Sequence, residues 1–150
     1  MTSAQTTLFA SEPQTAVLHF DGGSRGNPGP AAWGYTLVDS SGEPIASQGR
    51  TIGIATNNEA EYGGLIAGLA RALDLGVRHL AVHGDSKLVI EQMAGRWRVK
   101  APGLQGLSRD ARALSGRFAS ITFEHVRRGF NKEADRLVNV ALDAEAARFS

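Results

Sequence analysis

The sequence contains no cysteine, and none of its 150 residues belong to an apolar run near the ~20 residues that a membrane-spanning helix needs. Without cysteine, the chain has no disulfide, no zinc–thiolate centre and no thiol nucleophile. Residues 1–14 contain neither a basic region nor an apolar stretch, so they do not form a secretory signal. We therefore expect a cytoplasmic chain without a membrane anchor, in which residues 1–14 form a flexible tail.

The net charge is also small, but it is unevenly distributed. The formal net charge is +1, yet residues 96–128 carry eight Lys or Arg and two acids, which gives this segment a charge of +6 and leaves −5 for the rest. An acidic region beside a basic one suits a polyanion that is held at one place and processed at another. The alternative for Arg109, Arg112 and Arg117 is a solvent-exposed helix face.

The apolar pattern predicts one α/β domain over residues 15–150. Alternating or β-branched runs indicate strands at 15–21, 32–39, 44–53, 79–84 and 120–126. Helical periodicity indicates one helix that ends at Gly76, a short one that stops at Gly95, one near 104–117, and a last one capped by Asn131. This order gives a five-stranded mixed sheet, with an antiparallel meander followed by parallel strands, flanked by helices.

Glycines occupy two informative places in this pattern. The segment Gly22–Pro30 holds four glycines and two prolines, so we expect it to be a linker that neither continues a strand nor starts a helix. Gly63, Gly64 and Gly68 lie inside the first helix, where each costs roughly 1 kcal/mol relative to alanine. We therefore expect another element to pack very close to that helix.

Four acidic residues stand where a strand ends or a helix begins. Asp21 ends an apolar run and precedes two glycines, and Asp85 ends the run that starts at residue 79. Glu61 and Asp135 lie in the first turns of two predicted helices. Such positions meet at one edge of an α/β sheet, so we expect the four carboxylates to converge. They would repel one another unless divalent cations bind among them, and metal-bound carboxylates are widely used to cut phosphodiesters.

Three of these acids also have structural explanations. Asp21 could be a turn residue, Asp85 could cap the helix that follows it, and Asp135 could interact with the positive end of a helix dipole. However, Gly22–Gly23 already supplies the turn, and Ser86 can cap the helix. Four acids at mutually consistent places are therefore better explained by a shared function.

The first helix carries two nearby acids with different expected roles. Thr56 and Glu59 fit a capping box, in which Thr56 caps the helix and the Glu59 side chain accepts a hydrogen bond from the backbone N–H of Thr56. Glu61 precedes Tyr62 and borders the apolar stripe of the helix. A carboxylate at a half-buried edge needs a partner, and a metal ion is a natural one. Glu59 is therefore the structural acid and Glu61 the functional one.

Four short motifs carrying these acids occur in order along the chain. They are Phe20-Asp21-Gly22-Gly23 leading to Gly26-Asn27-Pro28-Gly29-Pro30; Thr56-Asn57-Asn58-Glu59-Ala60-Glu61; Gly84-Asp85-Ser86; and Asn131-Lys132-Glu133-Ala134-Asp135. Together, at this spacing, they make a specific signature that resembles the type 1 ribonuclease H family. The resemblance runs from about Val17 to Ala144, which is nearly everything outside the N-terminal tail.

This resemblance implies a ribonuclease H-like fold and a metal-dependent endoribonuclease. Members of the family cleave the RNA strand of RNA–DNA hybrids and leave 5′-phosphate and 3′-hydroxyl ends. The resemblance implies two Mg²⁺ ions about 4 Å apart, with Mn²⁺ as an alternative, that activate the attacking water and stabilise the leaving oxygen. The implied catalytic and metal-binding residues are Asp21, Glu61, Asp85 and Asp135.

The resemblance also implies contacts to the nucleic acid. A hybrid presents a wide, shallow minor groove lined on one strand by 2′-hydroxyls, and contacts to these groups identify RNA. The implied contacts are Gly23, Ser24, Asn27, Asn57 and Asn58 on the RNA side, with Thr56 and Trp97 on the DNA side. Thr56 could instead serve only as a helix cap, and Trp97 could close the edge of the core.

Three features differ from the better-known bacterial members. The loop 126–131 lacks the usual histidine, for which Arg127 or Arg128 could substitute, since His125 lies on a predicted strand. Only residues 97–103 stand in place of the long basic protrusion, and Ile54 replaces an arginine of the phosphate pocket. These features resemble the compact, archaeal-like branch, whose members can also cut double-stranded RNA or RNA–DNA junctions.

Several alternatives remain open from the sequence. The same site could act on double-stranded RNA or junctions, or the chain could be a non-catalytic module that binds hybrids. A DNA transposase or integrase shares the architecture, but Asn57-Asn58 and the lack of a DNA-targeting domain argue against it. We expect a monomer, with an RNA–DNA hybrid as its principal partner.

Overall fold

The computed structural model describes residues 14–149 of the chain. The predicted flexible tail lies outside the described residues, except for Gln14. The carbonyl of Gln14 accepts hydrogen bonds from the backbone N–H groups of Arg78 and His79, both at 2.9 Å. No helix within residues 14–149 is long and apolar enough to cross a membrane.

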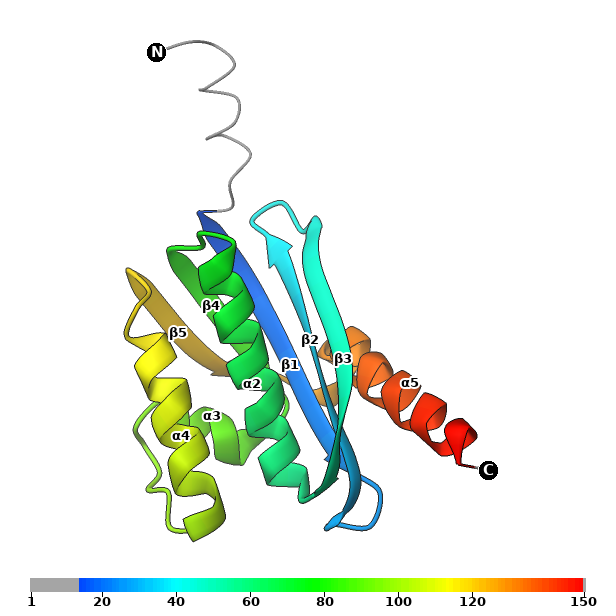
Figure 1. The fold of residues 1–150 in the computed structure, drawn as a ribbon. Helices are drawn as coiled ribbons and strands as arrows, with labels where there is room; N and C mark the ends of the chain where they lie inside the picture. The colour runs from blue at the N-terminus through cyan, green and yellow to red at the C-terminus, as the bar shows by residue number, and fades with distance from the viewer. Residues whose placement is uncertain (1–13, 150) are drawn as a thin grey trace.

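The elements follow one another in the predicted order (Figure 1). The strands are β1 (Thr15–Ser24), β2 (Gly29–Asp39), β3 (Pro44–Ala55), β4 (His79–Gly84) and β5 (Ser120–His125). The α-helices are α2 (Asn57–Asp74), α3 (Lys87–Met93), α4 (Pro102–Ser115) and α5 (Lys132–Arg148), with a short 3-10 helix η1 (Arg128–Phe130) before α5.

The strands form one mixed sheet in the order β3-β2-β1-β4-β5. β1 pairs antiparallel with β2, and β2 pairs antiparallel with β3. β1 pairs parallel with β4, and β4 pairs parallel with β5. The predicted antiparallel meander with parallel strands is therefore confirmed. Because β1 and β4 run in the same direction side by side, Asp21 and Asp85 end at the same edge of the sheet.

Helix α2 packs unusually close to β1, as its glycines predicted. A Cβ atom on Gly64 would lie 2.6 Å from the carbonyl oxygen of Asp21, and one on Gly68 would lie 2.4 Å from the side chain of Leu18. From the strand side, a Cβ atom on Gly22 would lie 2.2 Å from the backbone carbon of Ala60. These close approaches place the first turns of α2, which carry Glu61, directly against the end of β1.

Helix α5 covers the opposite face of the sheet from α2. Trp33 contacts α2 through Gly63 and Gly64, whereas a Cβ atom on its neighbour Gly34 would lie 2.7 Å from the carbonyl oxygen of Ala134 in α5. Successive strand residues point to opposite faces, so the two helices sandwich β2. Figure 1 shows α2 and α4 side by side and α5 apart from them, at the β2–β3 end of the sheet.

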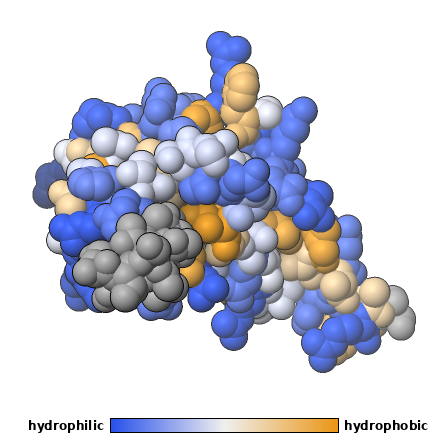
Figure 2. Space-filling model, turned by 90° about the horizontal axis from the view of Figure 1, so that it is seen from above, coloured by the Kyte–Doolittle hydropathy of each residue, from blue (hydrophilic) through white to orange (hydrophobic). Residues whose placement is uncertain are grey.

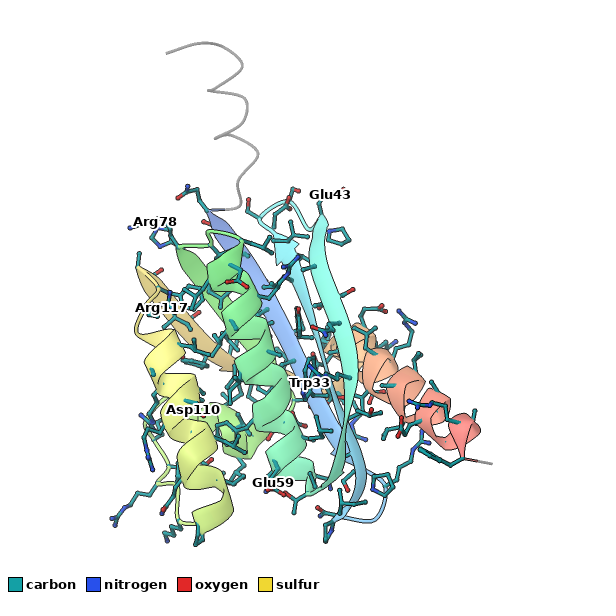
Figure 3. The ribbon with its side chains drawn as sticks, in the orientation of Figure 1. Trp33, Glu43, Glu59, Arg78, Asp110 and Arg117 are labelled. Atoms are coloured by element: carbon teal, nitrogen blue, oxygen red, sulfur yellow. The ribbon has the colours of Figure 1, made fainter. Side chains whose placement is uncertain are left out.

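The main hydrophobic core lies between the sheet and helices α2, α3 and α4. Its largest fully buried side chains include Leu18, Phe20, Tyr62 and Leu65. Figure 3 shows Trp33 between α2 and the sheet, where its side chain is 8% exposed. On the face that Figure 2 shows, hydrophilic residues cover most of the surface and hydrophobic residues form separate small groups.

Two sequence-based expectations about local structure are wrong. β1 continues to Ser24 and β2 starts at Gly29, so most of the expected linker is strand, with Gly23 paired to Ala32. Glycine is needed at Gly22 for the close approach of α2 rather than for a turn. In addition, α4 begins at Pro102 rather than near residue 104, and Pro102 occupies its first turn, a position where its missing N–H costs nothing.

Candidate active site

Three of the four predicted acids meet at the end of β1. Asp21 lies on β1, Glu61 in the first turns of α2, and Asp85 directly after β4. One carboxylate oxygen from each lies within 4.8 Å of the others. Asp21 is 6% exposed and Glu61 is 8% exposed, so the cluster is largely removed from water. The geometry is that of a cation site built from oxygen ligands.

The fourth acid, Asp135, lies on the first turn of α5 and lines the same cavity. This cavity has a volume of about 410 Å³ and is lined by all four acids. Asp135 is close enough to Asp21 and Asp85 to raise the pKa of both carboxyls. The structure therefore brings the four acids together from four different elements.

The carboxyl groups of this cluster are held in an unfavourable environment. Burial, together with the charge of Asp85, raises the pKa of Asp21 to about 7. Burial and the charge of Asp21 raise the pKa of Glu61 well above its usual range. Burial also raises the pKa of Asp85, which the nearby Arg128 partly offsets. Mutual repulsion of this kind is relieved when a divalent cation binds.

One oxygen of Glu61 gives a further indication that the cluster suits a cation. Among the described residues, Glu61 Oε2 is buried and has no hydrogen-bond partner. A buried carboxylate oxygen without a partner costs free energy, so it is normally satisfied by a donor or a cation. The residues present therefore fit a divalent metal ion. Asp21, Glu61 and Asp85 are placed to hold it, with Asp135 at the rim of the cluster.

Asn131 occupies the N-cap position of α5, as predicted, but its side chain does not cap the helix. Its side chain makes no capping hydrogen bond, and its Nδ2 donates instead to the carbonyl oxygen of Phe20 at 2.8 Å. Asn131 is 1% exposed, so this bond is buried. It connects the segment before Asp135 to the residue before Asp21, and sequence reasoning missed it because asparagine before a helix usually indicates a cap.

The predicted RNA contacts form a hydrogen-bonded group at one side of the cavity. The Ser24 N–H donates to Asn57 Oδ1 at 2.8 Å, and the Asn57 N–H donates to Asn27 Oδ1 at 2.9 Å. Gly23, Ser24, Asn57 and Asn58 line the cavity itself. Asn27 therefore supports Asn57, and the exposed amides are positioned next to the acids.

The capping box predicted for α2 is present. Thr56 Oγ1 accepts from the Glu59 N–H at 3.1 Å, and Glu59 Oε1 accepts from the Thr56 N–H at 2.9 Å. Figure 3 shows Glu59 at the beginning of α2. Thr56 and Glu59 thus have a structural role, which leaves Glu61 as the acid that α2 supplies to the cluster.

Comparisons with known proteins identify the family. A family model described as reverse transcriptase-like matches residues 19–141. The crystal structure of RNase H1 from the archaeon Halobacterium salinarum NRC-1 superimposes with a TM-score of 0.84 and 46% sequence identity, covering 87% of this chain and 98% of that chain. The chain belongs to the type 1 ribonuclease H family.

Two further solved structures extend the comparison. The N-terminal RNase H domain of Rv2228c from Mycobacterium tuberculosis has a TM-score of 0.88 and 50% identity, covering 91% of this chain and 99% of that chain. LC11-RNase H1, solved in complex with an RNA/DNA hybrid, has a TM-score of 0.83 and 34% identity, covering 87% of this chain and 99% of that chain. The chain spans 36% of the length of the curated mycobacterial relatives it matches, among them the bifunctional protein Rv2228c.

In this ribonuclease H domain, an arginine lies in the loop that lacks the histidine usual in bacterial members. Arg128 lies on η1, with its Nε 3.8 Å from Asp85 Oδ2 and its side chain 86% exposed. His125 ends β5, and its Nε2 is 3.2 Å from the backbone oxygen of Asp85 rather than from the carboxylate. Arg128 is thus the loop side chain that reaches the acids.

Trp97 lies on the connection between α3 and α4, away from the core. Its side chain is 43% exposed and forms a hollow of about 410 Å³ with Arg96, Arg98 and Lys100. The Nζ of Lys87 lies 6.0 Å from the centre of the Trp97 ring. The alternative in which Trp97 closes the core edge is therefore wrong.

Of the three arginines predicted for this helix, Arg109 and Arg112 lie on α4, and Arg112 has a structural contact. Its Nη2 donates to the backbone oxygen of Gln92 at 2.7 Å and so ties α4 to α3. Arg109 is exposed, as expected for a solvated helix face, whereas Arg117 is exposed but lies after the end of α4.

Proposed function

We propose that the chain is an endoribonuclease that hydrolyses the RNA strand of RNA–DNA hybrids, giving 5′-phosphate and 3′-hydroxyl ends. The observation that carries this proposal is the cluster of buried carboxylates at Asp21, Glu61 and Asp85, with oxygens within 4.8 Å of one another. A module that only binds nucleic acid has no use for converging acids with raised pKa values. The related LC11-RNase H1 in complex with an RNA/DNA hybrid supports the choice of substrate.

Asp21, Glu61, Asp85 and Asp135 are the residues that we propose as ligands for two Mg²⁺ ions, with Mn²⁺ as an alternative. The buried, unpartnered Glu61 Oε2 and the raised pKa of Asp21 support a cation in this cluster. Magnesium and manganese prefer carboxylate oxygens, which are the donors present. When bound, such ions activate water for attack and stabilise the charge that develops on the leaving oxygen.

Arg128 lines the same cavity as the acids and is positioned to assist them. Its guanidinium lies 3.8 Å from the Asp85 carboxylate, and its side chain is largely exposed. Once cations neutralise Asp85, this ion pair weakens and Arg128 can turn to a phosphate oxygen, which guanidinium binds well. Arginine stays protonated at neutral pH, so we propose that Arg128 holds the phosphate and does not transfer a proton.

Substrate recognition is proposed for the residues beside the acids. Ser24, Asn57 and the backbone of Gly23 offer donors and acceptors to 2′-hydroxyls, supported by Asn27 and joined by Asn58 at the cavity wall. Trp97, exposed among basic residues, is suited to stack or pack against the second strand. Thr56 completes the set as a proposed contact to a phosphate of the DNA strand.

A broader substrate is the second candidate. The proposed contacts around Asn57 bind 2′-hydroxyls, which double-stranded RNA also presents. The second strand would contact only the compact basic hollow around Trp97, whether that strand is DNA or RNA. We therefore propose cleavage of double-stranded RNA or RNA–DNA junctions as the alternative. We also propose that the enzyme acts as a monomer in the cytoplasm.

The test is cleavage of an end-labelled RNA–DNA hybrid and of double-stranded RNA, with Mg²⁺ or Mn²⁺, by wild type and Asp85→Asn. Asp110→Asn is the matched control, since Asp110 is an exposed acid on α4 (Figure 3). Metal-dependent cuts in the RNA strand that disappear in Asp85→Asn and persist in Asp110→Asn would support the proposal. No cutting of either duplex would overturn it.

A further inference from the structure

Arg25 connects the loop after β1 to helix α5 across one side of the cavity. Its backbone N–H donates to the carbonyl oxygen of Pro30 at 2.8 Å, which fixes the start of the loop. Its guanidinium Nη2 donates to Asp143 Oδ1 at 2.7 Å and to Asn139 Oδ1 at 3.5 Å, both on α5. The Arg25 side chain is 44% exposed, so it is held in place at the surface without being buried.

This arrangement continues to the first turn of α5. The Nδ2 of Asn139 donates to the backbone oxygen of Asp135 at 3.1 Å, while its Oδ1 accepts from Arg25. Arg25 and Asn139 both line the cavity that contains the acids. A chain of hydrogen bonds therefore runs from the turn that carries Asp135 to the Arg25 guanidinium.

Arg25 and Arg128 are the two cations on the wall of this cavity, and they occupy different places. Arg128 lies against the carboxylate of Asp85, at the η1 side. Arg25 lies at the α5 side, where its partner is Asp143. The proposed function assigns a phosphate contact to Arg128 and leaves Arg25 without a role.

We propose that Arg25 binds the RNA phosphate next to the scissile one, and that Asp143 positions Arg25 and moderates its charge. The inference rests on the proposed function and deepens it. Both hydrogen bonds to α5 use Nη2, so the Nη1 donors can meet a phosphate oxygen while Asp143 stays bound. A guanidinium fork suits phosphate oxygens, and it carries its charge at all working pH values.

The position of Arg25 favours the RNA strand over the DNA strand. It directly follows Ser24, whose N–H bonds to Asn57, and these two residues are the proposed contacts to RNA 2′-hydroxyls. It shares a cavity with the acids, so a strand whose scissile phosphate lies at the acids carries a neighbouring phosphate past Arg25. Trp97, proposed for the second strand, belongs to a different hollow.

The first test measures the binding of a hybrid across a range of salt concentrations, in an Asp85→Asn background that prevents turnover. Arg25→Gln is expected to weaken binding by roughly fivefold to tenfold and to reduce the salt slope by about one, as for one lost phosphate contact. The matched control is Arg148→Gln, which removes an arginine of α5 that pairs with Glu145 at 3.7 Å. It should leave both quantities nearly unchanged.

The role of Asp143 gives a result of opposite sign. Asp143→Asn should tighten hybrid binding by about twofold to threefold, because the amide oxygen can still accept from Arg25 Nη2 and position it, but it no longer offsets the positive charge that the phosphate meets. Glu145→Gln is the control for a charge removed from α5, and it should have a smaller effect. Thermal unfolding should change little in all four variants, since exposed ion pairs contribute little to stability.

The second test identifies the phosphate. Binding is measured for hybrids that carry one neutral methylphosphonate at successive positions of the RNA strand. The two proteins compared are the parent, which is Asp85→Asn alone, and the same protein with Arg25→Gln added. The parent should lose affinity at one position next to the scissile phosphate, and Arg25→Gln should show no additional loss there. Equal losses in both proteins at every position would overturn the inference about Arg25. A parent that binds no hybrid at all would instead overturn the proposed function.

Discussion

The side-chain amide of Asn131 donates a hydrogen bond to the backbone carbonyl of Phe20, 2.8 Å away and 111 residues earlier in the chain. Asn131 precedes the helix that carries Asp135, and Phe20 precedes Asp21 on β1. The bond therefore sets the distance between two of the proposed metal ligands. In a site where the ligands come from four elements, such a contact decides how well they converge.

Asn131→Ala should reduce both stability and activity. The Phe20 carbonyl would lose the buried donor that Asn131 supplies, which costs about 1–3 kcal/mol in the free energy of unfolding. We expect kcat to fall by about tenfold with a smaller change in KM, because Asp135 is displaced. Urea unfolding and steady-state cleavage measure the two effects.

Gln105→Ala is the control for Asn131→Ala. Gln105 also donates from its amide to a backbone carbonyl, that of Val99 at 3.2 Å, but this bond is exposed. It should cost less than about 1 kcal/mol and leave kcat unchanged. Equal losses in the two variants would contradict a special role for the Asn131 bond.

Asp21→Asn should stabilise the metal-free protein while abolishing activity. Folding raises the pKa of Asp21 to about 7 through burial and the charge of Asp85. The folded state therefore holds the proton more strongly than the unfolded state, and wild type loses stability as the pH rises from about 4 to about 7. The variant avoids this loss, so its advantage should be near zero at pH 4 and reach about 4 kcal/mol above pH 7, at about 1.4 kcal/mol for each unit of pKa.

The measurement is urea unfolding from pH 4 to pH 8 in EDTA and in Mg²⁺. Magnesium should stabilise wild type more than Asp21→Asn, since the cation relieves the repulsion that the substitution removes. A variant that is less stable than wild type at pH 8 in EDTA would contradict the account of the acidic cluster.

Gly64→Ala should damage the site by moving α2. The new Cβ atom would lie 2.6 Å from the carbonyl oxygen of Asp21, so the helix that carries Glu61 must shift. We expect a loss of about 2–4 kcal/mol in stability and a large loss of cleavage. Gly106→Ala in α4 meets nothing within 4 Å and should be stabilising by about 0.5–1 kcal/mol. Thermal unfolding of the two variants distinguishes packing from helix propensity.

Trp97→Ala should weaken hybrid binding without affecting the fold. An exposed aromatic residue that contacts a base or sugar contributes about 1–3 kcal/mol, which corresponds to roughly fivefold to 150-fold in Kd. Phe149→Ala is the control, because Phe149 is 77% exposed and lies at the far end of α5. Fluorescence anisotropy with a labelled hybrid measures both. Unchanged affinity in Trp97→Ala would remove this residue from the proposed interface.

Much of this architecture could be predicted from the sequence because it follows local rules. The element order, the capping box of α2 and the acids at strand ends all depend on residues within a few positions of one another. The contacts that position the side chains of the site depend instead on residues far apart in the sequence. Asn131 meets Phe20 across 111 residues and Arg25 meets Asp143 across 118 residues, and neither pair leaves a periodic signal. Gly22 was misread for a similar reason, since close packing and a turn both require glycine.

The most direct test of the central claim compares two acids that are two residues apart on α2. RNA-strand cleavage of a hybrid is measured against Mg²⁺ concentration for wild type, Glu61→Gln and Glu59→Gln. Glu59→Gln should keep its activity within a few-fold, because glutamine can also serve in a capping box. Glu61→Gln should lose at least about 100-fold, because a ligand of the cation site is lost. Equal activity in the two variants would contradict a catalytic metal site built from Asp21, Glu61 and Asp85.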